Sequence, residues 1–324
     1  MADIKSYDQT FLETALRDML LIRRFEEKAA QMYGLRKIGG FLHLYNGQEA
    51  VAVGSVAAID LTKDYILTSY RDHGHALAVG MSPNSIMAEM FGKITGCVRG
   101  KGGSMHMFDA ERHFLGGNGI VGAQIPLATG VAFKQMYTED GGVTLCYFGD
   151  GAIHQGAFHE SLNLAKIWNL PVIYIVENNH FGMGTAVHRV SGVDDFSVKA
   201  AGYDLPGKVI DGMDFLTVYE EIGKIAEETR KSGTAYLIDM KTYRYKGHSI
   251  SDPAKYRTKD ELESYKQQDP IVKLKAQMIE ADLYSDDAFK KLDDEIKQIV
   301  QDAVDFSEKS EEPALHTMYE DILA

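Results

Sequence analysis

Short, continuous apolar runs alternate along this chain with longer segments in which apolar residues recur every three or four positions. The continuous runs are rich in β-branched and aromatic residues, which is typical of buried strands, and they occupy residues 65–68, 143–148, 172–176 and 236–240. The longest periodic segment begins at Leu12 and ends at Gly34, which predicts an amphipathic helix with a glycine stop. This alternation predicts an α/β fold, a doubly wound parallel sheet with helices on both faces.

Residues 143 to 184 form one compact unit within this pattern. The first apolar run ends at Asp150, between two glycines, and a helical spacing of apolar residues then continues as far as Pro171. A second apolar run follows and ends at Asn178-Asn179. Because a strand-helix-strand unit crosses over right-handedly, both strands run parallel, and Asp150 and Asn179 emerge at the same edge of the sheet. Ligands of open parallel sheets bind at that edge.

The side chains at this edge are hard oxygen donors, one carboxylate and one amide, with no pair of cysteines or histidines beside them. Such donors suit Mg²⁺ better than Zn²⁺. Magnesium usually takes only one or two carboxylates together with phosphate oxygens, so a phosphorylated cofactor is expected. The N-terminus of the predicted crossover helix would offer free N–H groups to those phosphates.

The last part of the chain has a different character. From Lys259 onward it is highly charged and helical in its periodicity, and no low-complexity linker or internal repeat separates it from what precedes. We therefore expect an α/β domain over residues 1–258, including the N-terminal helix, and a C-terminal helical extension over residues 259–324 that packs on it.

Composition excludes several classes of partner and compartment. The net charge of −13 and the isoelectric point near 5.3 argue against nucleic acid and against an anionic membrane surface. The two cysteines, Cys97 and Cys146, form no CxxC pattern, which favours a reducing compartment. No apolar run is long enough to span a bilayer, and the N-terminus lacks the features of a signal or transit peptide. A bacterial cytoplasm is the expected location, or the mitochondrial matrix if a presequence has been removed.

A rival function is suggested by Gly117-Asn-Gly-Ile-Val-Gly122, which matches the GxGxxG pattern of nicotinamide-dependent dehydrogenases. No clear strand is predicted before it, and no strand-borne acid follows at about twenty residues. The pattern is therefore weak support for a dehydrogenase that binds NAD.

The sequence Gly149-Asp150-Gly151, followed after 26 residues by Asn178-Asn179, resembles the signature of thiamine-diphosphate enzymes. In those enzymes the aspartate, the second asparagine and a backbone carbonyl two residues later hold the Mg²⁺ of the cofactor. The resemblance thus implies a metal site of Asp150, Asn179 and Phe181. It also implies that Gly151 and Ala152 contact the cofactor.

Further segments resemble the α subunit of the first component of 2-oxo acid dehydrogenase complexes, with pyruvate dehydrogenases the nearest group. They are residues 40–50, the Tyr70-Arg71 pair, the glycine-rich loop 100–106, and Gly-His-Ser-Ile-Ser-Asp-Pro at 247–253, which lies in a locally basic stretch with Arg244, Lys246, Lys255 and Arg257. The resemblance spans nearly the whole chain. Asp72 departs from it, because relatives often have a small residue there.

Site roles follow from this resemblance. His43 would line the active-site channel, and His248 would reach the cofactor diphosphate and the active site. Tyr70 and Arg71 would contact the diphosphate. Backbone groups around Gly119 and Val121 would hold the aminopyrimidine ring, with Val121, or else Ile120, as the apolar wedge that keeps the cofactor bent.

The same resemblance implies an activity and partners. Pyruvate would be decarboxylated with thiamine diphosphate and Mg²⁺, and its acetyl group passed to a lipoyl group on an acyltransferase component. The glutamate that activates thiamine lies on a separate β subunit in such relatives, so an α₂β₂ heterotetramer is expected and the chain alone would be nearly inactive. An acetoin or branched-chain 2-oxo acid enzyme, and a non-catalytic assembly subunit, remain alternatives.

Overall fold

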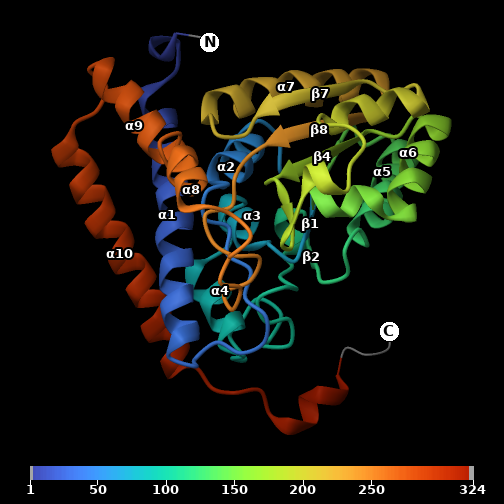
Figure 1. The fold of residues 1–324 in the computed structure, drawn as a ribbon. Coiled ribbons are helices and arrows are strands. Elements are labelled where there is room, and N and C mark those ends of the chain that lie inside the picture. The colour runs from blue at the N-terminus through green and yellow to red at the C-terminus, as the bar shows by residue number, and fades with distance from the viewer. Residues whose placement is uncertain (1–2, 321–324) are drawn as a thin grey trace.

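The computed structural model describes residues 3 to 320 and is built around one six-stranded parallel sheet (Figure 1). The strand order is β2-β1-β3-β4-β8-β7, and every neighbouring pair is parallel. The strands are β1 (Tyr65–Ser69), β2 (Phe114–Asn118), β3 (Thr144–Gly149), β4 (Val172–Asn178), β7 (Gly207–Asp211) and β8 (Tyr236–Lys241), with a separate small hairpin of β5 (Phe181–Gly182) and β6 (Thr185–Ala186). The predicted α/β class and parallel sheet are confirmed.

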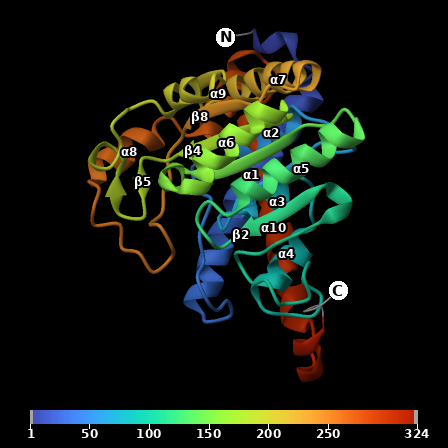
Figure 2. The same cartoon turned by 90° about the vertical axis from the view of Figure 1, so that its right-hand side faces the viewer.

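Helices cover both faces of the sheet, as Figures 1 and 2 show. The α-helices are α1 (Gln9–Gly34), α2 (Glu49–Ala57), α3 (His73–Ala78), α4 (Pro83–Met90), α5 (Gln124–Thr138), α6 (Gly156–Trp168), α7 (Phe215–Ser232), α8 (Lys259–Lys266), α9 (Pro270–Glu280) and α10 (Asp286–Lys309). Short 3₁₀ turns are η1 (Ile4–Ser6), η2 (Ala110–Arg112), η3 (Asp150–His154), η4 (Val187–Arg189), η5 (Phe196–Tyr203) and η6 (Leu315–Tyr319).

The sheet divides the buried apolar residues between two cores, because successive side chains of a strand point to opposite faces. In β3, Leu145 and Tyr147 join the core shared with α1, α2 and α7, whereas Cys146 and Phe148 join the core shared with α5 and α6. Burial on both faces explains why the central strands read as continuous apolar runs rather than alternating ones.

Two strands of the sheet were not predicted from the sequence. β2 has the sequence Phe-Leu-Gly-Gly-Asn and β7 has Gly-Lys-Val-Ile-Asp, and both lie at edges of the sheet. Edge strands bury less apolar surface, so they lack the continuous apolar run that marks a central strand. β7 buries only Ile210.

The chain order within the sheet creates a switch point between β1 and β3. From β1 the chain moves outward to β2, and from β3 it moves the other way to β4, so the connections at the carboxyl ends of these two strands diverge. A crevice forms at such a point in doubly wound sheets. The residues that follow β1, β3 and β4 are therefore brought to one place.

The C-terminal helices lie beside the N-terminal helix rather than on the sheet (Figure 1). Helix α10 contacts α1 and α4, and the Nε of Arg24 lies 2.6 Å from a carboxylate oxygen of Asp293 across the α1–α10 contact. Ser285 caps α10 through the Ala288 amide at 3.1 Å. Within residues 3–320, no helix is both long and apolar enough to cross a membrane.

Candidate active site

A cavity of about 200 Å³ lies at the carboxyl ends of the central strands. Nine of the residues assigned by the family resemblance line it: Tyr70, Arg71, Val121, Asp150, Gly151, Ala152, Asn179, Phe181 and His248. They come from the loops after β1, β2, β3, β4 and β8. The crevice expected from the strand order is therefore the place where the predicted residues meet.

Asp150 stands at the end of β3, in the first position of the η3 turn. Burial raises the pKa of its carboxyl to about 6, against the lowering effects of its backbone hydrogen bond and of Arg244. A Cβ placed on Gly182 would lie 3.8 Å from a carboxylate oxygen of Asp150, so the segment after β4 passes directly beside this acid. The buried carboxylate and the Phe181–Gly182 backbone thus share one site.

The η3 turn changes one expectation about the phosphate site. Asp150 begins the η3 turn, and the rest of this turn and Gln155 separate it from α6, which begins at Gly156. The backbone amides beside the cavity are therefore those of Gly151 and Ala152, rather than those of the crossover helix.

Asn179 and Phe181 present two oxygens toward a single guanidinium group. The Nη1 of Arg244 donates to the side-chain oxygen of Asn179 and to the carbonyl of Phe181, each at 3.3 Å. The amide nitrogen of Asn179 donates to Gln48 at 2.9 Å, which turns its oxygen toward the cavity side. The two oxygens predicted to bind a metal are already arranged around a cation.

Arg244 is the main site residue that the sequence did not single out. It is 2% exposed, and its other nitrogens donate to the carbonyls of Met183 and Lys246 and to the hydroxyl of Tyr256. It was noted only as one member of a basic stretch. Its distinguishing property is burial, which the local sequence does not reveal.

Arg71 brings a second buried guanidinium to the same cavity. Its nitrogens donate to the carbonyls of Leu44 at 2.6 Å and His248 at 2.9 Å. Burial and the nearby Arg244 lower the pKa of Arg71 to about 10, so it remains charged at neutral pH. Two buried like charges repel each other in a low-dielectric site, and an anion between them removes that cost.

His43, Tyr70 and His248 form a cluster of rings, in which Tyr70 and His248 line the cavity and His43 lies outside the lining, packed against both. The ring centroid of His43 lies 4.4 Å from that of Tyr70 and 5.1 Å from that of His248. Burial, followed by the charge of Arg71, lowers the pKa of His43 to about 2 and that of His248 to about 4. Both imidazoles are neutral at pH 7, and the buried Nδ1 of each has no hydrogen-bond partner.

The segment after β2 forms another wall of the cavity. Val121 lines it and is 41% exposed, whereas Ile120 is 76% exposed and lies outside the lining. Gly119 is also outside the lining and packs against His106, whose ring atoms would lie 3.1 Å from a Cβ at that position. Of the two candidates for the apolar wedge, only Val121 faces the cavity, and its role there stays a prediction.

The expectation that no strand precedes the GxGxxG pattern was wrong, because β2 runs directly into it. The glycine at position 117 is nevertheless explained by packing within the chain. A Cβ on Gly117 would lie 2.0 Å from a carboxylate oxygen of Asp72 and 2.5 Å from the Met105 carbonyl. Gly117 thus permits close packing against Asp72, the residue that departs from the family pattern.

A second layer of buried polar residues supports the cavity. Gln48, which holds Asn179, is followed by Glu49, and Glu49 binds Arg23 through two hydrogen bonds of 2.6 and 3.0 Å. Glu177 lines the cavity, accepts a hydrogen bond from the Tyr45 hydroxyl and lies 3.3 Å from Nε2 of His75. The sequence does not reveal these partners, because they come from segments far apart in the chain.

The donor set fits Mg²⁺ and a diphosphate. Among residues 3–320, no group of three or more histidines, cysteines or acids is placed to hold a metal, so the available ligands are one carboxylate, one amide oxygen and one carbonyl. Such a set suits a hard cation that shares its coordination with phosphate oxygens. The two buried arginines and the histidine nitrogens without partners are groups that can bind the oxygens of a diphosphate.

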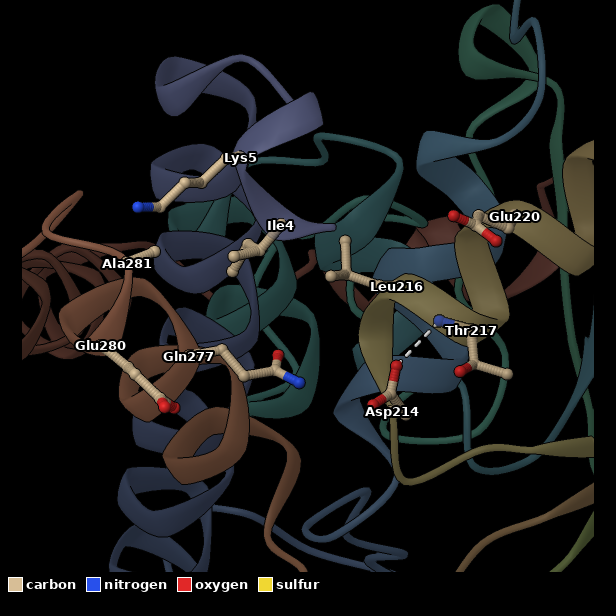
Figure 3. A pocket seen from close by; sticks show the side chains of 9 residues that line it. All are labelled: Ile4, Lys5, Asp214, Leu216, Thr217, Glu220, Gln277, Glu280 and Ala281. Carbon is tan, nitrogen blue, oxygen red and sulfur yellow. Dashed lines mark hydrogen bonds between the residues drawn. The ribbon is translucent and has the colours of Figure 1, made fainter. Parts of the chain in front are cut away.

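Another hollow, of about 290 Å³, lies between the N-terminal turn, α7 and α9 (Figure 3). It contains none of the predicted site residues. Its buried acid, Asp214, caps α7 by accepting a hydrogen bond from the Thr217 amide at 2.8 Å, as the dashed line in Figure 3 shows. Asp214 is thereby used in the fold, and nothing there matches the chemistry of the first cavity.

Known proteins resemble this chain in sequence along nearly its whole length. The model of the dehydrogenase E1 component family matches residues 17–316. The pyruvate dehydrogenase E1 component subunit alpha of Rhizobium meliloti (strain 1021) is 51% identical over 310 residues, which cover 95% of this chain and 89% of that protein. The subunit of the same name from Rickettsia bellii (strain RML369-C) is 45% identical, with 95% and 94% covered, and that from Porphyra purpurea is 44% identical, with 91% and 88% covered. The chain belongs to the dehydrogenase E1 component family.

Proposed function

We propose that this chain is the α subunit of a pyruvate dehydrogenase first component, which uses thiamine diphosphate and Mg²⁺ to decarboxylate pyruvate oxidatively and to transfer its acetyl group to a lipoyl group. One observation carries the proposal: the Asp150 carboxylate, the Asn179 amide oxygen and the Phe181 carbonyl share a cavity with two buried arginines. The names of the relatives support pyruvate as the substrate.

In this proposal Asp150, Asn179 and the Phe181 carbonyl hold Mg²⁺. Arg71, Tyr70, His248 and the backbone amides of Gly151 and Ala152 hold the diphosphate, while Val121 and the backbone at Gly119 position the aminopyrimidine. When bound, thiamine diphosphate supplies the electron sink for decarboxylation. The protein contributes rigid positioning, because most of these groups lie at strand ends rather than on long loops.

His43 and His248 are the proposed catalytic residues. Their lowered pKa values keep both imidazoles neutral at pH 7, and the Nδ1 of each has no partner within the protein and is free to form a hydrogen bond with a ligand. Tyr70 contacts both rings and restricts their orientation. A neutral histidine pair, with His248 in the cavity wall and His43 packed against it, is suited to orienting a 2-oxo acid through hydrogen bonds.

The proposed partners are a β subunit, in an α₂β₂ heterotetramer, and the lipoyl-bearing acyltransferase component. The acids that line the cavity within the described residues are Asp150 and Glu177. Asp150 is assigned to the metal, and Glu177 is engaged by Tyr45 and His75. The carboxylate that activates thiamine is therefore assigned to the β subunit. The bacterial relatives favour the cytoplasm as the location, with the mitochondrial matrix as the alternative.

Reconstitution tests this function directly. The purified chain is combined with its β subunit, thiamine diphosphate and Mg²⁺, and turnover of pyruvate, acetoin and branched-chain 2-oxo acids is compared. We expect turnover of pyruvate to be fastest and the chain alone to be nearly inactive. Preference for acetoin or a branched acid would reassign the substrate, and robust turnover by the chain alone would overturn the shared site.

A second experiment separates a catalytic from an assembly role. His43→Asn and His248→Asn are expected to lower pyruvate turnover about 100-fold or more each, the usual range for a positioned acid or base. Assembly with the β subunit, measured by sedimentation velocity, should be unchanged. Full activity in both variants would favour a non-catalytic subunit.

A further inference from the structure

The turn of residues 46–49 lies directly behind the proposed metal ligand Asn179. Gln48 in this turn is fully buried, and its side-chain oxygen accepts a hydrogen bond of 2.9 Å from the amide nitrogen of Asn179. The guanidinium of Arg244 can only donate, so the Asn179 atom that it contacts is the oxygen. The Asn179 amide therefore has one orientation, with its nitrogen toward Gln48 and its oxygen toward the proposed metal.

The backbone that carries Gln48 is held on two sides. The amide of Gly47 donates to both carboxylate oxygens of Glu49, at 3.1 and 3.0 Å. Gly47 has a φ of +98°, and a Cβ there would lie 2.3 Å from the carbonyl oxygen of Tyr243. The turn is thus packed against the segment that follows β8, and the position of Gln48 depends on the position of Glu49.

Arg23 on α1 connects Glu49 with Asp269. Glu49 is fully buried and accepts hydrogen bonds of 2.6 and 3.0 Å from Arg23, whose Nη2 also lies 2.8 Å from a carboxylate oxygen of Asp269. The same guanidinium lies over the ring of Tyr245, 5.1 Å from its centroid. Because a guanidinium stays charged and carries five donors in one plane, a single arginine can bind both acids.

Asp269 belongs to the C-terminal extension, where it is the N-cap of α9. Its other oxygen accepts hydrogen bonds from the amides of Ile271 and Val272, at 3.0 and 3.2 Å. It is 6% exposed, so solvent screens its ion pair less than it would screen a surface pair. We call the residues that connect α9 with Asn179 through direct contacts the Asn179 support: Asp269, Arg23, Glu49, Gly47 and Gln48.

We propose that Gln48 is a positioning residue for the metal ligand Asn179, and that the C-terminal extension holds it in place through the ion pair of Asp269 with Arg23. Partners that orient a metal ligand commonly change metal affinity by about 10- to 100-fold. This inference rests on the proposed function, because Asn179 is a metal ligand only in a thiamine-diphosphate site. It gives the extension a role in cofactor binding in addition to packing.

The variants Gln48→Met and Gln48→Glu test the positioning role. Each is assembled with the β subunit and thiamine diphosphate, and its affinity for Mn²⁺ is measured by electron paramagnetic resonance. Gln48→Met removes the acceptor at similar volume, so the affinity should fall about tenfold, whereas Gln48→Glu keeps an acceptor oxygen and should stay within about threefold. A packing role alone would give the reverse order, because a buried carboxylate disturbs its surroundings more than a thioether does.

Gln135→Met is the matched control for the loss of a buried glutamine. Gln135 is 1% exposed and binds the carbonyl of Lys63 at 3.0 Å and the hydroxyl of Thr144 at 2.5 Å. Thr144 is the first residue of β3, at the end of the sheet opposite the cavity. The melting temperature of Gln135→Met should fall while its Mn²⁺ affinity is unchanged, which separates a general loss of stability from a loss of metal positioning.

Asp269→Asn tests the contribution of the extension. Asparagine caps a helix about as well as aspartate, so this change weakens the ion pair with Arg23 and keeps the cap of α9. The Mn²⁺ affinity should fall about threefold. Asp214→Asn is the matched control, because Asp214 caps α7 and lies 2.7 Å from Nζ of Lys273, and neither contact involves the Asn179 support. Its Mn²⁺ affinity should be unchanged.

The outcomes separate this inference from the proposed function. Equal Mn²⁺ affinity in Gln48→Met and in the unsubstituted tetramer would overturn the positioning role and leave the proposed function intact. Equal affinities in Asp269→Asn and Asp214→Asn would overturn the role of the extension, and this comparison decides the matter if Gln48→Met does not assemble. An unsubstituted tetramer without Mn²⁺ binding that depends on thiamine diphosphate would contradict the proposed function itself.

Discussion

Two buried carboxylates, Glu89 and Asp150, have opposite surroundings. Glu89 is fully buried, and its oxygens accept hydrogen bonds of 2.7 to 3.0 Å from the backbone amides of Val98, Gly100, Gly102 and Gly103. Asp150 is 4% exposed, and within the described chain no other residue donates a hydrogen bond to its carboxylate. A buried acid whose oxygens are all used organises the fold, here the glycine-rich loop, whereas one with free oxygens is available to a cation.

Two groups of buried histidines differ in the same way. His73 is enclosed between Glu26, at 3.0 Å, and Ser104, at 2.9 Å. Burial lowers its pKa, but Glu26 more than compensates and raises it to about 8. His43 and His248 have unpartnered Nδ1 atoms and lowered pKa values. His73 is thus held by the fold, and the other two are free for chemistry.

The largest expected effect is a difference in protein stability between substitutions of Glu89 and of Asp150. Glu89→Gln leaves one acceptor oxygen for four amides, so we expect the free energy of unfolding to fall by about 4 kcal/mol. Asp150→Asn should change it by less than about 1 kcal/mol, because no hydrogen bond from another residue is lost. Urea unfolding measures both, and equal stability of the two variants would contradict the assignment of Glu89.

The next largest effect concerns ligand binding, which we expect to depend on Asp150. Asp150→Asn should lower the Mg²⁺-dependent affinity for thiamine diphosphate by about 100-fold or more, because it removes the one charged group among the three proposed metal ligands. Calorimetric titration with and without Mg²⁺ provides the measurement. Asp204→Asn, at an exposed acid, is the control. Retained affinity in Asp150→Asn would refute the metal assignment.

Arg244 offers a smaller and more unusual test. Its guanidinium donates to two of the three proposed metal ligands, so it competes with a metal that binds alone. Arg244→Met should therefore raise the affinity for free Mn²⁺, measured by electron paramagnetic resonance, by about tenfold. Arg257→Met is the control, since Arg257 binds the carbonyls of Tyr245 and Lys246 instead. An unchanged or weaker Mn²⁺ affinity would show that Arg244 does not compete.

The smallest effect is the pH dependence of stability. His73 has a pKa raised from 6.5 to about 8, so its contribution is full below pH 6.5 and is lost as the pH rises through 8. His43 and His248 have lowered pKa values, so their contribution is full above pH 6.5 and is lost as the pH falls toward 4 and below.

Unfolding experiments from pH 4 to pH 9 test these directions. His73→Gln should flatten the alkaline side of the stability profile, and the double variant His43→Asn with His248→Asn should flatten the acidic side. Each histidine contributes no more than about 1.4 kcal/mol per pH unit. If His73→Gln altered only the acidic side, the Glu26 pairing would not control its protonation.

Much of the site was predictable because it stands at strand ends. The apolar runs identified β3 and β4, and their parallel crossover placed Asp150 and Asn179 at one edge before any contact was known. The chemistry of these donors also led to the prediction of Mg²⁺. Tyr70 and Arg71 were predicted through the family resemblance, and the structure places them directly after β1. These features depend on residues close together in the sequence, where periodicity and turn chemistry are decisive.

Other features required the tertiary structure. Nothing in the basic stretch 241–257 distinguishes Arg244 from Lys255, yet Arg244 is buried against Asn179 while Lys255 is exposed. In the sequence, Glu89 is indistinguishable from any other acid in a helix. Only the structure shows that the backbone amides of the glycine-rich loop surround its carboxylate.

The sequence alone thus determined the sheet class, the edge at which Asp150 and Asn179 emerge and the donor atoms available there, because short-range patterns govern strands and turns. Only the tertiary structure decided which charges are buried together and which polar atoms lack partners, because both depend on segments that meet through the topology of the sheet.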